Sequence, residues 1–266
     1  MKRIGFFTNT DKDSDMAITH ELIDFVQKLG HETTQDDIFD AVDFTVVLGG
    51  DGTMLRAASH CTSHPVPLLG INLGNVGYLT DVEKSQAKNA IQRVLSGNYL
   101  VEDRMMLAVN VDGHQTFALN DIVVHRGAGA RMVECAVSVD GEHVDTLRAD
   151  GLIIATPTGS TAYNFAAGGP VLKPDAHMVI LTPICPQSPS ARSVVVSVND
   201  SVCIHILHGT KATISFDGVN VETPQVAHIQ DDGFSINISP NDARARIIKT
   251  NNLGFYEILR MKMKKV

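Results

Sequence analysis

The strongest constraint on the fold is a change of hydrophobic pattern near residue 98. Before it, short apolar strands alternate with helical stretches, with strands at 3–8, 44–48 and 67–71 and helices at 16–29, from 53, and at 85–95. Strands that alternate with helices predict parallel strands joined by crossovers, with ligands bound at the carboxyl ends of the strands. We therefore expect an N-terminal α/β domain with parallel strands over residues 1–98.

The segment from residue 99 to 249 has a different pattern, dominated by valine, isoleucine and threonine with a repeat of two. Such runs occur at 106–111, 133–139, 194–198, 201–206 and 213–216. Asp-Gly pairs, which are strong turn signals, begin at residues 112, 140, 217 and 232. Together these features predict an all-β, antiparallel sandwich-like domain. The tail, 250–266, returns to an amphipathic helical pattern, and we expect it to pack back on the N-terminal domain.

Composition narrows the class of protein. Hydrophobic residues make up 44% of the 266 residues and charged residues 20%, with a formal net charge of -8, which is typical of a globular chain with a sizeable core. The acidic balance argues against a nucleic-acid-binding protein, which would show a basic face. One basic cluster, Arg260, Lys262, Lys264 and Lys265, is interpreted as the solvated end of a helix.

The N-terminal apolar run, Ile4 to Phe7, is too short for a signal-peptide core or a membrane span. The cysteines form no Cys-x-x-Cys pair, which argues against a disulfide framework or a zinc ribbon; they are Cys61, Cys135, Cys185 and Cys203. We therefore expect a cytoplasmic protein without membrane association. His60, Cys61 and His64 could be drawn as metal ligands, but a helix end carrying histidines is favoured because no acidic partner lies nearby.

The most informative local feature is the run Gly49-Gly50-Asp51-Gly52-Thr53, which lies between an apolar strand and a helical pattern. Its glycines let the backbone turn tightly, so that N–H groups at the helix start can face phosphate. A carboxylate in such a turn would repel phosphate unless it bridges a metal ion or accepts a proton from an attacking hydroxyl. The run therefore predicts phosphoryl transfer. The alternative is an Asp-Gly hairpin turn, which the following helix pattern disfavours.

Two further blocks suit a nucleoside. The stretch from Asp150 to Pro170 runs from a strand into a hydroxyl-rich segment with Tyr163, whose ring offers a stacking face. Asn120 and Asp121 follow an apolar strand and place beside each other an amide able to read a purine edge and a carboxylate able to bind sugar hydroxyls. The alternatives are a Ser/Thr-rich loop with a packed tyrosine and an Asx turn at a strand end.

These three blocks, the glycine turn, Asn120-Asp121, and Asp150 to Pro170, resemble the signature segments of the NAD kinase family. The segments 182–186 and 190–192 resemble a fourth. The resemblance implies transfer of the γ-phosphoryl of ATP, or in some members of inorganic polyphosphate, to the 2′-hydroxyl of the adenosine ribose of NAD, giving NADP. It also implies a divalent cation, expected to be Mg²⁺, and a homodimer or homotetramer in which the β-rich domains pair.

Roles for individual residues follow from the same resemblance. Asp51 is assigned to activate the 2′-hydroxyl, and the phosphate-donor turn is formed by Gly49, Gly50, Gly52 and Thr53. The NAD-binding set comprises Asp51, Gly52, Tyr78, Asn120, Asp121, Arg148, Asp150, Thr161, Ala162, Tyr163 and Cys185. Within it, Asn120 matches an asparagine that contacts adenosine, and Asp121 stands where the family usually has glutamate. The segment around Cys185 resembles one that reaches a neighbouring subunit's site.

Other nucleotide-binding motifs are missing from the sequence. No Gly-Lys dipeptide is present, which excludes a conventional P-loop, and Gly127-Ala128-Gly129 lacks the third glycine of a Rossmann fingerprint. NAD is therefore expected as a substrate and not as a redox cofactor. A lipid kinase with the same turn and a non-catalytic dinucleotide sensor remain as alternatives. The sequence also leaves open whether the phosphate donor is ATP or polyphosphate, whether the acceptor is NAD or NADH, and whether the oligomer is a dimer or a tetramer.

Overall fold

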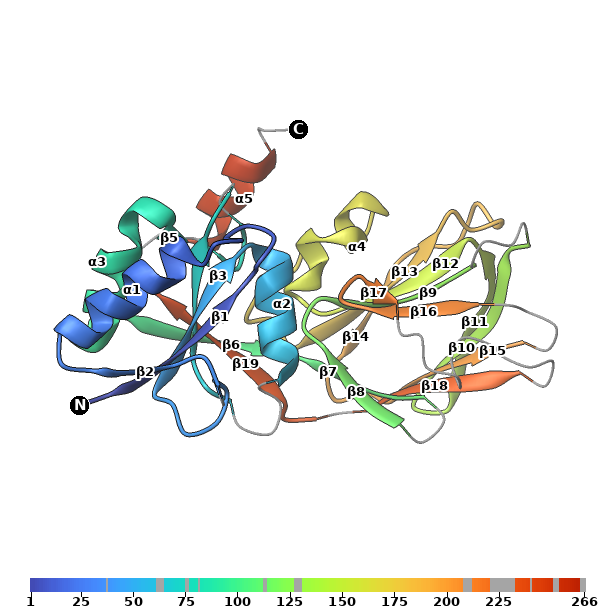
Figure 1. The fold of residues 1–266 in the computed structure, drawn as a ribbon. Helices are drawn as coiled ribbons and strands as arrows, with labels where there is room; N and C mark the ends of the chain where they lie inside the picture. Colours follow the sequence, from blue (N-terminus) through green and yellow to red (C-terminus); the bar gives the residue numbers. More distant parts are fainter. Residues whose placement is uncertain are drawn as a thin grey trace. The chain divides into compact units, whose positions relative to one another are not determined.

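The protein is described from a computed structural model that covers residues 1–36, 38–60, 65–74, 77–80, 82–111, 114–126, 131–207, 212–220, 233–239, 241–250 and 254–263. It forms two compact units, unit 1 (Met1–Arg104 with Arg244–Val266) and unit 2 (Met105–Ala243) (Figure 1). Several sequence features lie outside the described residues: Cys61, His64, Asp112-Gly113, Gly127-Ala128-Gly129, Asp232, Lys264 and Lys265.

Unit 1 is built on a sheet with the strand order β2-β1-β3-β4-β19-β6, in which β5 also pairs with β4. The strands are β1 (Arg3–Thr8), β2 (Glu32–Thr34), β3 (Phe44–Gly49), β4 (Leu68–Asn72), β5 (Val82–Glu83), β6 (Leu100–Met105) and β19 (Arg244–Lys249). Pairing is parallel from β2 through β1, β3 and β4 to β19 and β5. The expected parallel α/β architecture is thus confirmed.

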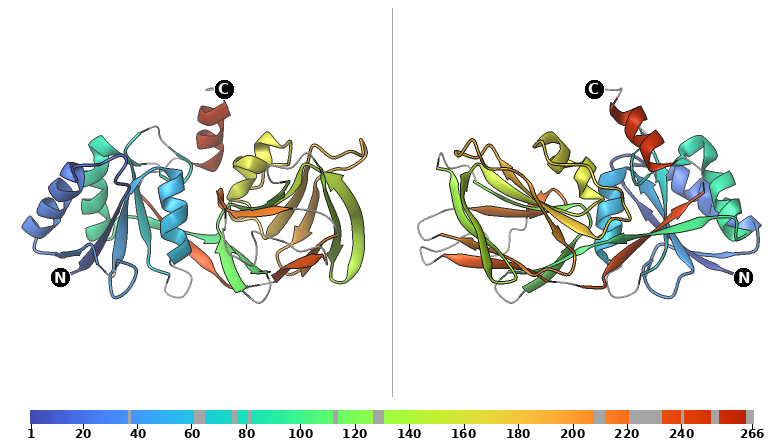
Figure 2. Two further views of the ribbon diagram at one scale, coloured as in Figure 1. Left: turned by 45° about the vertical axis from the view of Figure 1, so that its right-hand side comes forward. Right: turned by 180° about the vertical axis from the view of Figure 1, so that it is seen from behind.

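The helices of unit 1 cover both faces of this sheet. They are α1 (Ala17–Lys28), α2 (Asp51–His60), the 3₁₀ turn η1 (Lys84–Gln86), α3 (Ala87–Leu95) and α5 (Phe255–Met263). The crossover from β1 runs outward to β2 and the crossover from β3 runs the opposite way to β4. Because such crossovers are right-handed, α1 and α2 lie on opposite faces, with α3 beside α1 (Figure 2). This arrangement explains why all six residues of β3 are buried.

Unit 2 is an antiparallel β-sandwich, as expected. One sheet has the order β11-β10-β15-β18-β7-β8 and the other β14-β13-β12-β9-β16-β17. The strands are β7 (Leu107–Val111), β8 (His114–Ala118), β9 (Asp121–His125), β10 (Val133–Val139), β11 (Glu142–Ala149), β12 (Gly151–Ala155), β13 (Met178–Ile184), β14 (Val194–Ser197), β15 (Val202–Ile206), β16 (Thr213–Phe216), β17 (Val219–Asn220) and β18 (Phe234–Ser239). Alternate residues of both sheets, such as Val109, Val124 and Ile204, form one buried core between them.

Short segments complete unit 2. The 3₁₀ turn η2 (Gly159–Thr161) and the helix α4 (Tyr163–Ala166) follow β12. The Asp140-Gly141 and Asp217-Gly218 pairs have positive φ at both residues (51° and 82°, 51° and 78°), the conformation that a two-residue hairpin turn of the mirror-image type requires. They join β10 to β11 and β16 to β17.

Three boundaries differ from the sequence-based expectation. The strands β6 and β19 join the sheet of unit 1, so unit 2 spans 105–243 where the sequence suggested 99–249. The helix expected from Thr53 begins at Asp51. None of the helices in the described part of the chain is long and apolar enough to cross a membrane.

Candidate active site

The glycine turn between β3 and α2 is closed by Thr53. A Cβ at Gly49 would lie 2.2 Å from the Thr53 Oγ1 atom, so the turn requires glycine there. The same oxygen accepts hydrogen bonds from the Gly50 N–H (3.4 Å) and the Asn9 side-chain amide (3.1 Å). Within the described residues, the N–H groups of Asp51 and Gly52 have no hydrogen-bond acceptor. These are the free N–H groups that a helix N-terminus offers to an anion.

Asp51 holds the segment 77–80 against the start of α2. Its carboxylate accepts hydrogen bonds from the N–H groups of Tyr78 (2.8 Å), Leu79 (3.0 Å) and Thr80 (3.1 Å), and from the Thr80 hydroxyl (3.0 Å). A Cβ at Gly77 would lie 1.9 Å from the Asp51 Oδ1 atom, which explains the glycine. The Oδ1 atom accepts three of these hydrogen bonds, whereas the Oδ2 atom accepts only that of Tyr78, so Oδ2 keeps an acceptor position for a further hydroxyl.

Tyr78 lies in the same cluster. Burial, together with the nearby charge of Asp51, raises the pKa of the Tyr78 phenol above its ordinary value. The Lys262 ammonium of α5 lies 5.5 Å from the centre of the Tyr78 ring, within the range of a cation–π contact. The C-terminal helix therefore contacts the segment that Asp51 holds.

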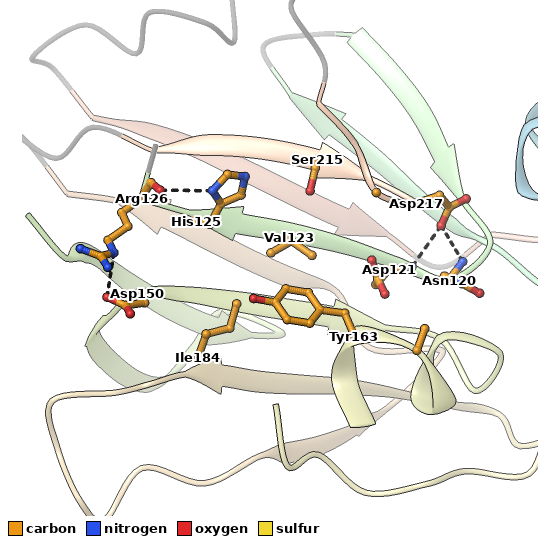
Figure 3. Close-up of a pocket in the computed structure, with 12 residues that line it drawn as sticks. Asn120, Asp121, Val123, His125, Arg126, Asp150, Tyr163, Ile184, Ser215 and Asp217 are labelled. Atoms are coloured by element: carbon orange, nitrogen blue, oxygen red, sulfur yellow. Dashed lines mark hydrogen bonds and ion pairs between the residues drawn. The ribbon is translucent and has the colours of Figure 1, made fainter. Parts of the chain in front are cut away.

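A second polar region lies in unit 2, where a cavity of about 630 Å³ opens on the sheet that contains β9 (Figure 3). This volume suits a small-molecule ligand. The cavity is lined by Asn120, Asp121, Val123, His125, Arg126, Asp150, Ala162, Tyr163, Ile184, Ser215, Asp217 and Gly218. Alternate residues of β9 line the cavity because they share one face of the sheet. Ser215, on the adjacent strand β16, lies beside Val123 of β9.

Asp217 shapes the end of this cavity. Its carboxylate accepts hydrogen bonds from the N–H groups of Leu119 (2.9 Å), Asn120 (2.7 Å) and Asp121 (3.1 Å). The turn before β9 is therefore held by a distant carboxylate, which leaves the Asn120 and Asp121 side chains to line the cavity (Figure 3).

The cavity contains unusual carboxyl groups. Burial and the neighbouring Asp217 raise the pKa of Asp121 to about 7. Burial also raises the pKa of Asp217, because it outweighs the three N–H donors, which lower the pKa by favouring the charged form. At the other end, Asp150 forms an ion pair with Arg126 (2.9 Å). The cavity thus offers hydrogen-bond acceptors and one paired cation to a polar ligand.

Tyr163 reaches the cavity from α4, and its ring extends toward Ile184 (Figure 3). The next residue, Asn164, is fully buried. Its amide nitrogen donates to the carbonyl oxygens of Ser160 (3.1 Å) and Pro170 (3.0 Å), and its oxygen accepts from the Thr182 hydroxyl (2.7 Å). This buried network attaches the segment 157–172 to β13 and thereby positions Tyr163.

Two hydroxyl groups of the block from Asp150 to Pro170, those of Thr156 and Ser160, serve the backbone, as the alternative of a Ser/Thr-rich loop implied. The Thr156 hydroxyl donates to the Leu119 carbonyl (2.6 Å), and the Ser160 hydroxyl donates to the Pro157 carbonyl (2.6 Å). Both side chains are fully buried. These hydroxyls satisfy backbone groups that the tight segment would otherwise leave unpaired, so they build the loop.

The residues expected to bind NAD fall into three groups. Asn120, Asp121, Asp150, Ala162 and Tyr163 line the cavity of unit 2, whereas Asp51, Gly52 and Tyr78 lie in unit 1. The remaining three are not among the lining residues, namely Thr161, Arg148 and Cys185. Of these, Arg148 pairs with Glu134 (3.1 Å), and Cys185 is an exposed free cysteine.

Several lining residues were not identified from the sequence, namely Val123, His125, Arg126, Ile184, Ser215, Asp217 and Gly218. The period-two pattern around Asp121 could have indicated Val123 and His125, which share its face. The Asp217-Gly218 pair gave a turn signal, but nothing local to it indicates contact with residue 119.

The described residues contain no group of three or more His, Cys, Asp or Glu side chains placed to hold a metal ion. His60, considered as a ligand from the sequence, instead stacks on Phe39 with ring centres 5.1 Å apart. The arrangement of protein ligands that a resident metal would require is not found in this part of the chain.

Comparisons with known proteins agree with this geometry. Residues 31–99 match the model of the ATP-NAD kinase N-terminal domain, and residues 119–245 match that of the ATP-NAD kinase C-terminal domain. NAD kinases of Caldanaerobacter subterraneus subsp. tengcongensis and Agathobacter rectalis are 35% and 36% identical to the chain, with 99% of each chain covered.

Solved structures are similar over the whole chain. An NAD kinase from Archaeoglobus fulgidus in complex with ATP gives a TM-score of 0.82 at 29% identity, with 99% of both chains covered. A yeast NADH kinase complexed with NADH gives 0.81 at 25% identity, covering 99% of this chain and 88% of that one. With both domain models matched and relatives aligned along nearly its full length, the chain belongs to the NAD kinase family.

Proposed function

We propose that this chain transfers the γ-phosphoryl of ATP to the 2′-hydroxyl of the adenosine ribose of NAD, giving NADP and ADP. The observation that carries the proposal is the cavity of unit 2, where Asn120, Asp121, Asp150 and Tyr163 converge in a chain of this family. An amide, carboxyl groups and an aromatic face are the groups that a nucleoside with sugar hydroxyls requires.

In this proposal Asp51 is the general base. The 2′-hydroxyl gives its proton to the Asp51 carboxylate as its oxygen attacks the γ-phosphorus, and the bond to the β-phosphate oxygen breaks to release ADP. The 2′-hydroxyl approaches the Asp51 Oδ2 atom, which accepts only the Tyr78 N–H (2.8 Å), whereas Oδ1 already accepts three hydrogen bonds. The free N–H groups of Asp51 and Gly52 bind donor phosphate.

A divalent cation is proposed to enter with ATP, since no set of protein ligands is found in the described part of the chain. Mg²⁺ is commonly held by substrate phosphates together with one or two carboxylates. We assign no residue to it.

We also propose a cytoplasmic homo-oligomer that pairs through unit 2. The strand β14 ends its sheet, and its Val194 and Val195 are exposed, as is Met178 on the neighbouring strand β13. An exposed apolar edge favours pairing with a second copy. Cys135, Cys185 and Cys203 are free thiols, which suits a reducing compartment.

The test of the activity is direct. Purified protein is incubated with NAD, ATP and MgCl₂, and NADP is measured with an NADP-specific dehydrogenase. Formation of NADP that depends on both ATP and protein is expected. Binding of NAD without any NADP formation, with ATP or with polyphosphate, would identify a dinucleotide sensor and contradict the proposal.

A further inference from the structure

The carboxyl ends of β1 and β3 meet at a special position in the sheet of unit 1. The two strands are neighbours, and the chain leaves them through helices on opposite faces (Figure 2). In open α/β sheets the crevice at such a point is where ligands bind. The turn after β3 is the glycine turn, and the loop after β1 spans residues 9–15.

Hydrogen bonds hold this loop beside the glycine turn. The Asn9 N–H donates to the Leu48 carbonyl (2.9 Å), and the Asn9 side chain donates to Thr53 (3.1 Å). The Asn9 carbonyl in turn accepts the N–H groups of Lys12 (3.0 Å) and Asp13 (3.1 Å). The backbone of Lys12 is therefore fixed relative to the turn.

The far end of the loop is fixed as well. The Asp13 side chain is 3% exposed and accepts hydrogen bonds from the N–H groups of Ile18 (3.1 Å) and Thr19 (3.0 Å) and from the Thr19 hydroxyl (2.7 Å). These bonds tie the loop to the first turn of α1. Lys12 thus lies between two anchored residues, Asn9 and Asp13.

The Lys12 side chain extends over the turns that follow β3 and β4. A Cβ at Gly50 would lie 3.1 Å from the Lys12 Nζ atom, and a Cβ at Gly74 would lie 3.8 Å from it. Within the described residues, no carboxylate lies within ion-pair distance of this ammonium group. In this part of the structure, a cation without a carboxylate partner among the described residues therefore lies over a turn whose N–H groups at Asp51 and Gly52 have no acceptor among them either.

We propose that Lys12 binds the phosphate chain of the donor, ATP, in the reaction proposed above, on which this inference rests. In a P-loop the lysine follows the glycines in sequence; here the chain has no Gly-Lys pair, and the cation comes from the neighbouring strand's loop. An ammonium group supplies a compact positive charge for phosphate oxygens. It also offsets the repulsion between Asp51 and the donor phosphates.

The inference is tested with Lys12→Met, which keeps most of the stem and removes the charge, and with Lys12→Arg, which keeps the charge. Lys28→Met is the matched control, since Lys28 is an exposed lysine at the other end of α1. The Met variant at position 12 is expected to raise the KM for ATP by about 10–100-fold, as for loss of a charged hydrogen bond. The KM for NAD should change by less than about twofold.

Two further measurements distinguish a phosphate-binding role of Lys12 from a structural one. The Arg variant should restore most of the ATP affinity, and wild type should bind inorganic tripolyphosphate in calorimetry about tenfold more tightly than Lys12→Met does. An unchanged KM for ATP in Lys12→Met would overturn the inference. So would equal increases in both KM values together with a lower melting temperature, which would make Lys12 a structural residue.

Failure of the inference and of the proposed function can be separated. If wild type and Lys28→Met form NADP normally while Lys12→Met matches them, only the role of Lys12 fails. If wild type forms no NADP, the proposed function fails, and the tripolyphosphate measurement still decides whether Lys12 binds a phosphate chain.

Discussion

At the scale of single residues, Asp121 has the most unusual environment in the cavity. It is 5% exposed, and burial next to Asp217 raises its pKa to about 7 from an unfolded value of 3.8. Because the folded state holds the proton more tightly, ionisation of Asp121 costs folding free energy. This cost is absent below about pH 4, grows as the pH rises, and is complete above about pH 7.

The prediction concerns Asp121→Asn. Relative to wild type, the variant should gain stability as the pH rises from about 4 to about 7, with a slope of up to roughly 1.4 kcal/mol per pH unit. Urea unfolding of both proteins across this range measures the difference. Two stability curves that stay parallel would show that Asp121 titrates in the folded protein as it does in the unfolded chain.

Asp51 lies in the glycine turn and also holds a distant segment of the chain. The sequence indicated a carboxylate in a glycine turn before a helix, and in the structure Asp51 is the first residue of that helix. Its four hydrogen bonds to residues 78–80 could not be foreseen, because those donors are far away in the sequence and reach Asp51 through the pairing of β3 with β4.

At the scale of elements, the segment 157–172 depends on Asn164. We predict that Asn164→Ala lowers the free energy of unfolding by about 1–3 kcal/mol. The variant removes the amide donor to the Ser160 and Pro170 carbonyls and leaves the Thr182 hydroxyl with Ser193 as its partner. It should also raise the KM for NAD, because Tyr163 loses its support. Chemical denaturation and initial rates measure the two effects.

A second variant distinguishes the positioning of Tyr163 by Asn164 from the proposed contact of Tyr163 with NAD. Tyr163→Ala removes the proposed stacking face itself, so it should weaken NAD binding by about 1–3 kcal/mol while unfolding at nearly the wild-type denaturant concentration, since Tyr163 is 47% exposed. If Asn164→Ala leaves the KM for NAD unchanged despite its lower stability, the network does not position Tyr163.

Elements with a clear local pattern could be predicted from the sequence. The strands at 3–8 and 133–139 have the expected bounds, because an apolar run or a strict alternation is visible within the strand itself. The placement of β6 and β19 in the first sheet could not be predicted. It depends on pairing between residues that are far apart in the chain, and neither strand's composition distinguishes one sheet from the other.

Contacts between residues far apart in the chain also determine which cavity residues could be predicted. Asn120, Asp121, Asp150 and Tyr163 belong to recognisable blocks, whereas Asp217 acts through hydrogen bonds to residues 119–121. Its local sequence indicates only a turn. The hydroxyls of Thr156 and Ser160 had the right chemistry for a ligand, yet burial commits them to the backbone.

At the scale of the whole molecule, the exposed apolar edge of unit 2 predicts self-association. Sedimentation velocity at micromolar concentration should show a dimer or tetramer. Replacing Val195 on β14 with lysine should shift the equilibrium toward the monomer, since an edge lysine opposes strand pairing. A monomer for wild type under these conditions would contradict the proposed assembly.

Asp51 has two proposed roles in the whole molecule, as the base of phosphoryl transfer and as the acceptor that holds the segment 77–80, and a control variant must separate them. Asp51→Asn removes the proton acceptor but also places an amide nitrogen among the N–H donors of Tyr78, Leu79 and Thr80. Thr80→Val keeps the carboxylate and removes two hydrogen bonds, the one from the Thr80 hydroxyl to Asp51 (3.0 Å) and the one from the Asn72 amide to that hydroxyl (2.8 Å). It should cost about 1–3 kcal/mol of stability and leave kcat within about tenfold of wild type.

The most direct measurement is the initial rate of NADP formation by wild type, Asp51→Asn and Thr80→Val at saturating NAD, ATP and MgCl₂. We expect Asp51→Asn to lower kcat by about 10²–10⁴-fold, far more than Thr80→Val, while the folded fraction of each variant is checked by circular dichroism. A folded Asp51→Asn variant that turns over within about threefold of wild type would show that Asp51 only holds the segment 77–80, and the proposed mechanism would be wrong.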